Sequence, residues 1–220
     1  MTSNKKIVYK FLDQSERRKF QKFVIRYWDK NHLFAKENSV FDWQHKRNNK
    51  FNYIIAKEGN DILGIQGLIP QSHFDKNLPN NQIFLTMWKA IENKGVSIGL
   101  QLYDNLIKKF SPEFIGVVGI NNEIVSFYKW QGYIVGNMDH SVVVSPYINK
   151  FRIIKIPQNF KTKIKEVNID VSYRNVNYDD LKRLNTNDLY KCQWPIKSDE
   201  YLFNRYIMHP IYNYDLYGIF

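Results

Sequence analysis

The chain has 220 residues, of which 44% are hydrophobic and 16% aromatic. This is enough apolar surface for a sizeable core, and it excludes an intrinsically disordered chain. The formal net charge of +11 favours anionic partners of any kind. The single cysteine, Cys192, excludes an intramolecular disulfide, and no Cys/His spacing predicts a metal site. Without a secretion-signal pattern or an apolar stretch of membrane-spanning length, we expect a cytoplasmic protein.

The first ninety residues predict strands, one helix and two loops. Asp13 and Glu16 have the spacing of a capping box, and the apolar stripe that follows is typical of a helix packed on a sheet. A turn containing Gly59 separates two apolar runs and predicts a hairpin. We expect strands at 6–11, 51–56, 62–69 and 82–90, a helix opening at 13–16 with its stripe over 20–28, and loops over 32–45 and 71–81.

The rest of the chain first completes one domain and then changes character. A glycine-bearing turn leads into a helix ending at Phe110, and a strand, a second helix and two short strands follow. The order of these elements predicts an α/β (α+β) domain with a mixed sheet. We expect strands at 114–120, 133–135, 141–144, 166–173 and 212–220, helices at 122–130, from 178 and around 199–208, and a domain boundary that divides the chain into 1–148 and 149–220.

One segment has the pattern of an anion-binding turn. It lies between a predicted strand and a predicted helix, where the first backbone N–H groups of the helix have no partner within the helix. Glycines allow close approach of a phosphate, and a lysine adds charge. The alternative is a simple strand-to-helix turn, and the spacing alone does not separate the two. The segment comprises Lys94, Gly95, Val96, Ser97, Ile98 and Gly99.

A second segment places a tyrosine near the end of a short helix that follows a strand. Asn121 precedes this helix, Tyr128 lies in its last turn and Gly132 ends it. A tyrosine hydroxyl can donate a proton, although a packed core aromatic would leave the same pattern.

Together the two segments resemble the GNAT acyltransferase superfamily. The family turn reads Arg/Gln-x-x-Gly-x-Gly/Ala, and the later helix reads Asn-x-x-Ala-x-x-x-Tyr-x-x-x-Gly-Phe. This sequence departs from those patterns by Lys for Arg/Gln, Ser for the first Gly, Ile for Ala and Tyr for Phe. The serine side chain crowds the phosphate turn. The matching residues are Lys94, Ser97, Gly99, Asn121, Ile124, Tyr128, Gly132 and Tyr133.

The resemblance implies a fold, a cofactor and site residues. It implies a mostly antiparallel central sheet flanked by helices, and acetyl-CoA or another acyl-CoA as co-substrate without a metal. Trp88, Lys89 and Ala90 would bind the pantetheine arm, the 94–99 turn and Asn121 would bind the rest of the coenzyme, and Tyr128 would protonate the departing thiolate.

The acceptor amine would meet a base and two loops. His73 and His140 are the first candidates for the base, because a neutral imidazole is available near pH 7. Trp43 in the 32–45 loop and Asp75 in the 71–81 loop would contact the acceptor, although Trp43 could equally fill the core.

A narrower resemblance concerns the substrate. Residues 41–44, 65–75 and 85–89 are similar to GNAT-like proteins encoded with bacterial surface-polysaccharide enzymes, in which a second, diverged GNAT-like half often follows; 203–214 resembles the opening of such a half. This implies a small amine acceptor, for example a nucleotide-linked amino sugar. The alternatives are a transferase that uses aminoacyl-tRNA, a basic module that binds nucleic acid or another polyanion, and a GNAT fold without catalysis. We expect no nucleic acid partner.

Overall fold

The computed structural model describes residues 6–91, 96–139, 155, 171–184 and 194–219. The chain divides into two compact units, one formed by Met1–Gly119 with Arg174–Gly218 and the other by Ile120–Tyr173 with Ile219–Phe220. The sequence-based division into 1–148 and 149–220 stays a prediction.

The first unit is built on a six-stranded sheet in the order β1-β3-β4-β5-β6, with β2 beside β3. All neighbouring strands are antiparallel except β5 and β6, which are parallel. The fold class is therefore confirmed as mixed α/β with a mostly antiparallel central sheet. The strands are β1 (Ile7–Asp13), β2 (Lys46–Arg47), β3 (Lys50–Glu58), β4 (Asp61–Pro70), β5 (Gln82–Ala90) and β6 (Phe114–Gly116).

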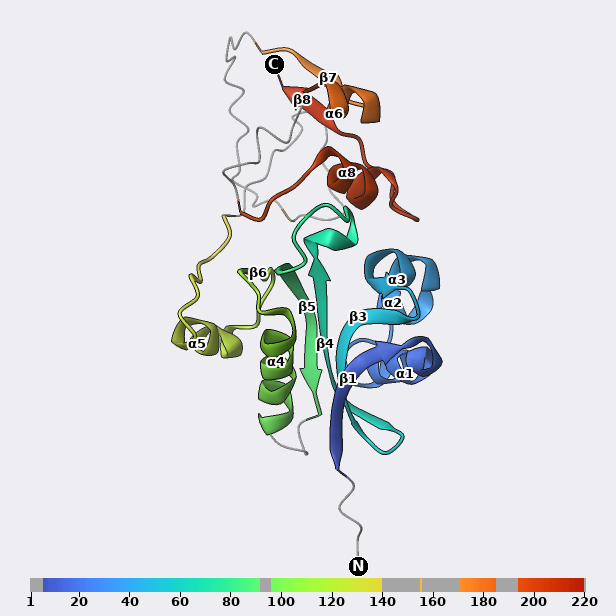
Figure 1. Ribbon diagram of the computed structural model, residues 1–220, viewed down its shortest axis with the longest axis vertical. Coiled ribbons are helices and arrows are strands. Elements are labelled where there is room, and N and C mark those ends of the chain that lie inside the picture. Colours follow the sequence, from blue (N-terminus) through green and yellow to red (C-terminus); the bar gives the residue numbers. More distant parts are fainter. Residues whose placement is uncertain (1–5, 92–95, 140–154, 156–170, 185–193, 220) are drawn as a thin grey trace, which may run out of the picture. The chain divides into compact units, whose positions relative to one another are not determined.

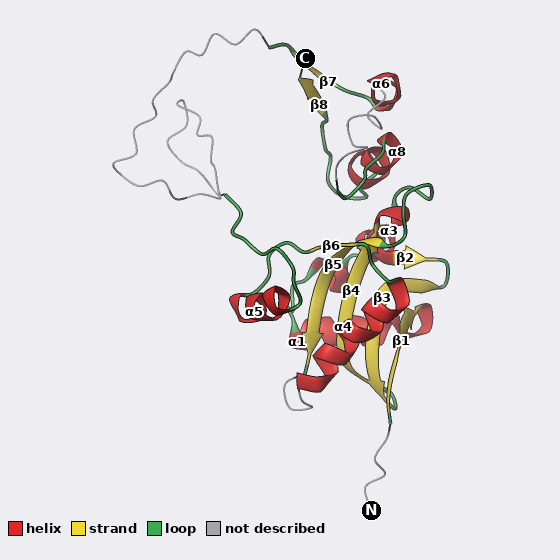
Figure 2. Cartoon of the chain, turned by 60° about the vertical axis from the view of Figure 1, so that its left-hand side comes forward, coloured by secondary structure: helices red, strands yellow, loops and turns green. Residues whose placement is uncertain are grey.

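Helices cover both faces of this sheet (Figures 1 and 2). α1 (Arg17–Tyr27), α2 (Leu33–Lys36) and α3 (Asn38–His45) lie on one face, and α4 (Val96–Phe110) lies on the other. Alternation along β4 explains the division, because Ile65 packs in the cluster with α1 while Gly64 meets α4. A side chain at Gly64 would crowd Leu102, with its Cβ 2.9 Å from Leu102 Cδ1, so the glycine allows α4 to approach the sheet closely.

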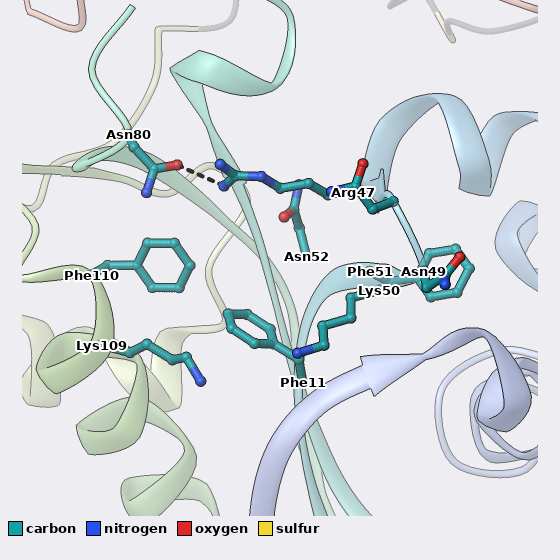
Figure 3. A pocket seen from close by; sticks show the side chains of 10 residues that line it. Phe11, Arg47, Asn49, Lys50, Phe51, Asn52, Asn80, Lys109 and Phe110 are labelled. Atoms are coloured by element: carbon teal, nitrogen blue, oxygen red, sulfur yellow. Dashed lines mark hydrogen bonds between the residues drawn. The ribbon is translucent and has the colours of Figure 1, made fainter. Parts of the chain in front are cut away.

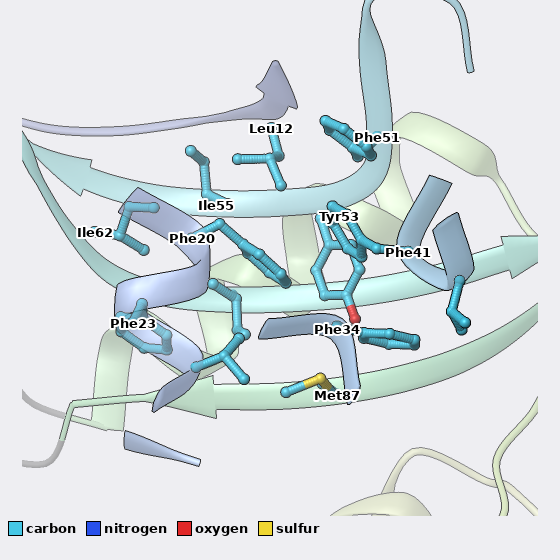
Figure 4. Packing of buried hydrophobic residues seen from close by; sticks show 13 residues of the cluster. Leu12, Phe20, Phe23, Phe34, Phe41, Phe51, Tyr53, Ile55, Ile62 and Met87 are labelled. Carbon is cyan, nitrogen blue, oxygen red and sulfur yellow. The ribbon is translucent and has the colours of Figure 1, made fainter. Parts of the chain in front are cut away.

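The main core lies between the sheet and α1 to α3 (Figure 4). Aromatic rings dominate it: Phe41 stacks on Phe20 and Phe51 with centroid distances of 4.9 and 4.6 Å. The ring of Tyr53 meets Phe20 edge-on at 4.7 Å. The aromatic stripe of α1 is thus a core stripe, as the sequence predicts.

The start of α1 also follows the sequence in part. Asp13 accepts a hydrogen bond from the Ser15 backbone N–H (3.0 Å) and caps a short 3₁₀ helix, η1 (Gln14–Glu16), that leads into α1. Glu16 has a different role from the one a capping box gives it. Its buried carboxylate pairs with Lys10 (2.8 Å) and Lys57, which ties η1 to β1 and β3.

Three predictions of local structure are wrong. The expected loop over 32–45 contains α2 and α3, because Phe34, Val40 and Phe41 are buried against the core and hold these short helices in place. The expected strand over 114–120 ends at Gly116, because its pairing with β5 stops after three residue pairs. Residues 133–135 form no strand. The strand expected at 141–144 lies outside the described residues.

Other predicted elements are confirmed. The hairpin is β3 and β4, the strand at 82–90 is β5, and the helix at 122–130 is α5 (Asn122–Trp130). Towards the C-terminus, α6 (Tyr178–Leu184) is followed by α8 (Asp199–Leu202), which continues as the π-helix η4 (Phe203–Ile207). β7 (Tyr173–Asn175) pairs with β8 (Tyr217–Ile219), so the terminal strand is shorter than expected. Among the described residues no helix is long and apolar enough to cross a membrane.

Candidate functional site

A bulge interrupts β5 in the middle of the sheet. Gln66 pairs with Trp88 and Leu68 with Leu85, so Gly67 alone lies opposite both Thr86 and Met87. Such a bulge bends its strand and is common beside active sites. Gly67 is required there, because an added Cβ would lie 2.6 Å from Tyr53 Cζ and closer still to the Thr86 hydroxyl.

The bulge begins where β6 leaves β5. The parallel ladder joins Gln82 to Phe114, Ile83 to Ile115 and Phe84 to Gly116, and there β6 ends. β5 continues to Ala90, so β6 covers only the first third of it (Figure 2). An extended molecule can form hydrogen bonds with the part of a strand edge that the neighbouring strand does not pair with. Among the described residues, the edge of β5 that faces β6 has no strand pairing beyond Phe84.

The first turn of α4 lies beside the same half of β5. The Trp88 indole N–H donates to the Gly99 carbonyl at 3.2 Å, and its ring stacks on Tyr103 at 5.8 Å. The first backbone N–H groups of a helix lack partners within the helix and carry the positive end of its dipole. The structure thus brings the predicted strand end and the predicted anion-binding turn together.

The side chains of the predicted turn differ in their exposure to solvent. Ile98 is buried and packs under the helix, whereas Ser97 is exposed. The helix begins at Val96, so the predicted turn contributes backbone groups of the first helical turn. Lys94 and Gly95 lie outside the described residues. Lys89 and Ala90 pair with Ile65 and Gly64 on β4.

Tyr128 and Asn121 belong to the second unit. Asn121 caps α5, because its side-chain oxygen accepts from the Glu123 backbone N–H (3.4 Å), and Gly132 leaves the helix with φ +85°. Burial, and secondarily Tyr133, raises the pKa of Tyr128 to about 12. The hydroxyl therefore keeps its proton at neutral pH and can donate it. His140 lies outside the described residues.

His73 has partners on both ring nitrogens. Nε2 lies 2.8 Å from the Trp43 carbonyl, which can only accept, so Nε2 carries the proton; Nδ1 then accepts from the Asn52 side-chain amide at 3.1 Å. Burial lowers the pKa of His73, and Arg205 and Arg47 lower it further. His73 is thus neutral near pH 7, but its one lone pair is already engaged. Its role as a base stays a prediction.

Trp43 and Asp75 contact the chain's own C-terminal segment, defined as residues 196–209. The indole N–H of Trp43 donates to the Asn204 carbonyl at 3.0 Å. The buried Asp75 carboxylate accepts from the Ser198 hydroxyl at 2.5 Å. The Arg205 guanidinium lies 5.0 Å from the Trp43 ring centroid. These contacts hold the C-terminal segment against α3 and the loop before β5.

Sequence reasoning missed two parts of this arrangement. The bulge at Thr86 depends on how two strands register, but Gly67 in the interior of an apolar strand was a signal for it. The contacts of Asp75 and Trp43 join residues far apart in the chain and leave no local pattern. Among the described residues no group of three or more His, Cys, Asp or Glu side chains could hold a metal ion.

Comparison with protein-family models and with curated proteins finds no match. Some solved structures share part of the arrangement. They include an acetyltransferase of the GNAT family from Staphylococcus aureus (19% identity, 58% of this chain and 81% of that chain, TM-score 0.40). An aminoglycoside acetyltransferase from an uncultured soil metagenomic sample has 13% identity over 64% of this chain and 99% of that chain, with a TM-score of 0.46.

A proposed acetyltransferase from Pyrococcus horikoshii has 9% identity over 61% of this chain, with a TM-score of 0.45. This chain spans only 45% of that protein. At this degree of likeness, neither a family nor an activity follows for this chain from the comparisons. The geometry of β5 and α4 therefore remains the basis for assigning a function.

Proposed function

We propose that this chain is an acyl-CoA dependent N-acyltransferase of the GNAT type. The observation that carries the proposal is the bulged half of β5, which β6 leaves uncovered and which ends beside the first turn of α4. An extended pantetheine arm, which contains amides, can pair with such a strand edge. The pyrophosphate that follows it in coenzyme A suits the N–H groups at the start of a helix.

The reaction needs orientation and two proton movements. The acceptor amine attacks the thioester carbonyl carbon, a tetrahedral intermediate forms, and the C–S bond breaks. The amine loses a proton to a base, and the thiolate gains one. The resemblance of residues 121–133 to the GNAT helix assigns the second proton to the Tyr128 hydroxyl, which is protonated at neutral pH. His73 and His140 remain the candidates for the base.

The acceptor is the least constrained part of the proposal. The net charge of +11 favours capture of two anionic substrates, so a nucleotide-linked amino sugar is the finer proposal. For Trp43 and Asp75, the contacts with the C-terminal segment favour an anchoring role over contact with the acceptor.

A charge placed in the first turn of α4 tests the coenzyme site. Ser97→Asp puts a carboxylate where the pyrophosphate would bind, and an acid at this position stabilises the helix itself by about 0.3–1 kcal/mol. The variant should therefore fold. Gln101→Glu adds the same charge at an exposed position one turn further along α4 and is the matched control.

Thermal unfolding with acetyl-CoA and with CoA gives the result. A ligand at a hundredfold excess over its Kd adds about 2.7 kcal/mol, which raises the Tm by roughly 5–10 °C. We expect this rise in the parent chain and in Gln101→Glu, and none in Ser97→Asp. A rise with polynucleotide but not with coenzyme, steeply reduced by salt, would instead support the polyanion-binding module. Release of free thiol with a panel of amino-sugar nucleotides and simple amines then identifies the acceptor.

A further inference from the structure

A separate pocket of about 490 Å³ opens between the start of β3, the loop before β5 and the C-terminal end of α4 (Figure 3). It lies at the far end of α4 from the proposed coenzyme turn. The 15 residues of α4 separate the two by about 20 Å at 1.5 Å per residue. Nothing in the proposed acyl transfer uses this pocket.

The pocket collects positive charge, and the only cross-strand acidic neighbour among the described residues, Asp13 opposite Lys50, does not line the pocket. Arg47 and Lys50 are directly paired across the β2–β3 turn, so their side chains leave the same face of the hairpin, where like charges repel. Lys109 of α4 also lines the pocket, and its ammonium group lies 4.1 Å from the Phe11 ring centroid. In the described part of the chain none of the three forms an ion pair, and no acidic residue lines the pocket. A bound anion would relieve the repulsion.

Asn80 adds a hydrogen-bond donor to the three cations at the rim. Arg47 uses one N–H to bond the Asn80 side-chain oxygen at 3.1 Å, and that same oxygen accepts from Ser72 at 2.9 Å. Asn80 therefore turns its carbonyl oxygen away from a ligand and keeps its amide N–H₂ as a donor. Guanidinium, ammonium and amide donors together suit the oxygens of a phosphate group.

The floor of the pocket is aromatic. Figure 3 shows the rings of Phe11 and Phe110 facing the same space, and their centroids are 6.0 Å apart in an edge-on arrangement. The ammonium group of Lys109 lies over the Phe11 ring, and Lys50 lines the same pocket. A flat ring can pack against the parts of Phe11 and Phe110 that line the pocket and are not covered by Lys109, and a volume of about 490 Å³ is in the range of pockets that hold whole small molecules rather than a bare ion.

We propose that this pocket binds a nucleoside phosphate, with the phosphate held by Arg47, Lys50 and Lys109 and the ring against Phe11 and Phe110. The site is independent of acyl transfer. UDP is a suitable probe, because it carries a base and two phosphates but lacks the adenine and the pantetheine arm of coenzyme A. Its phosphates could also reach the coenzyme turn, and Ser97→Asp separates the two sites.

The test is isothermal titration calorimetry of UDP with the full chain. The double variant Lys50→Gln/Lys109→Gln removes two charges that line the pocket. Lys46→Gln/Lys108→Gln removes two charges from the same hairpin and helix that do not line it, since Lys46 pairs with Asp42 and Lys108 with Asp104. We expect Kd to rise about tenfold or more in the first variant and to stay within about twofold in the second. Ser97→Asp should bind UDP like the parent chain.

Three probes separate the contributions. Pyrophosphate should bind about tenfold more weakly than UDP, because it lacks the ring. Equal affinity for the two would overturn the nucleoside part of the proposal, and equal losses in the two double variants would reduce the effect to the general field of the protein. An oligothymidylate that displaces UDP and binds more tightly would identify a polynucleotide partner and overturn the small-ligand assignment.

Discussion

The hydroxyl of Ser198 holds the C-terminal segment in two ways, so its removal should release that segment. It donates to the buried Asp75 carboxylate at 2.5 Å and accepts from the Tyr201 backbone N–H at 3.1 Å as the cap of α8. Losing a hydrogen bond to a charged group costs roughly 1.5–3 kcal/mol, and losing a helix cap costs about 1 kcal/mol. Ser198→Ala should therefore favour opening of the segment by roughly 2.5–4 kcal/mol.

Limited trypsin digestion measures this opening, because Lys197 and Arg205 are cleavage sites within the segment. When opening is fast relative to cleavage, the cleavage rate follows the open population, and 1.4 kcal/mol changes that population tenfold. We expect cleavage at these two sites to accelerate about 60-fold or more in Ser198→Ala. Ser198→Thr, which keeps the hydroxyl, should behave like the parent chain. An acceleration below about threefold, or an equal one in Ser198→Thr, would show that this pair does not hold the segment.

Four further substitutions test the fold. Asp13→Ala should lower the free energy of unfolding by about 1 kcal/mol at pH 7. Hydrogen bonding from Ser15 lowers the pKa of Asp13 to about 2. Urea unfolding should therefore show the stability difference between the two chains above pH 4, and this difference should disappear as the pH falls through 2. Burial holds the pKa of His45 well below its usual value, so the chain takes up a proton when it unfolds below pH 6.5. In the parent chain this makes the free energy of unfolding fall between pH 6 and 5, and His45→Phe should reduce that fall by about 1.4 kcal/mol per pH unit. Equal slopes in the two chains would mean that His45 titrates alike in the folded and unfolded states. In the same urea assay, Gly64→Ala should destabilise the chain by about 1–3 kcal/mol, because the new Cβ would lie 2.9 Å from Leu102. Gly99→Ala should stabilise the chain by roughly 0.5–1 kcal/mol, because alanine favours a helix over glycine and its Cβ would lie at an ordinary 3.6 Å from Trp88.

The parts of the fold that the sequence predicts are those coded locally. The hairpin of β3 and β4 follows from two apolar runs around Gly59, and α1 follows from the stripe that includes Phe20 and Val24. α2 and α3 lack such a signal, because each has at most two turns and is stabilised mainly by burying Phe34 and Phe41. Tertiary packing, not local preference, decides segments of this length.

The candidate site divides in the same way. The sequence marks the region between β5 and α4 as a candidate site, because a glycine and a serine where a helix follows a strand are a local pattern, and its anion binding stays a prediction. The Asp75 contact joins two side chains 123 positions apart, and no residue near Asp75 indicates Ser198. From the sequence, an isolated acidic residue in a loop could contact a substrate or another part of the chain. The structure shows the second, because the Asp75 carboxylate is buried against the chain itself.

Gly67 connects the fold to the proposed activity. Its opposite neighbours are two residues of β5, and the Thr86 side chain and the Tyr53 ring occupy the space where a Cβ would lie. A side chain at this position would have to displace both, so Gly67 permits the bulge by leaving this space to Thr86 and Tyr53. The bulge lies in the half of β5 that the proposal assigns to the coenzyme, which ties the proposed site to the packing of the sheet.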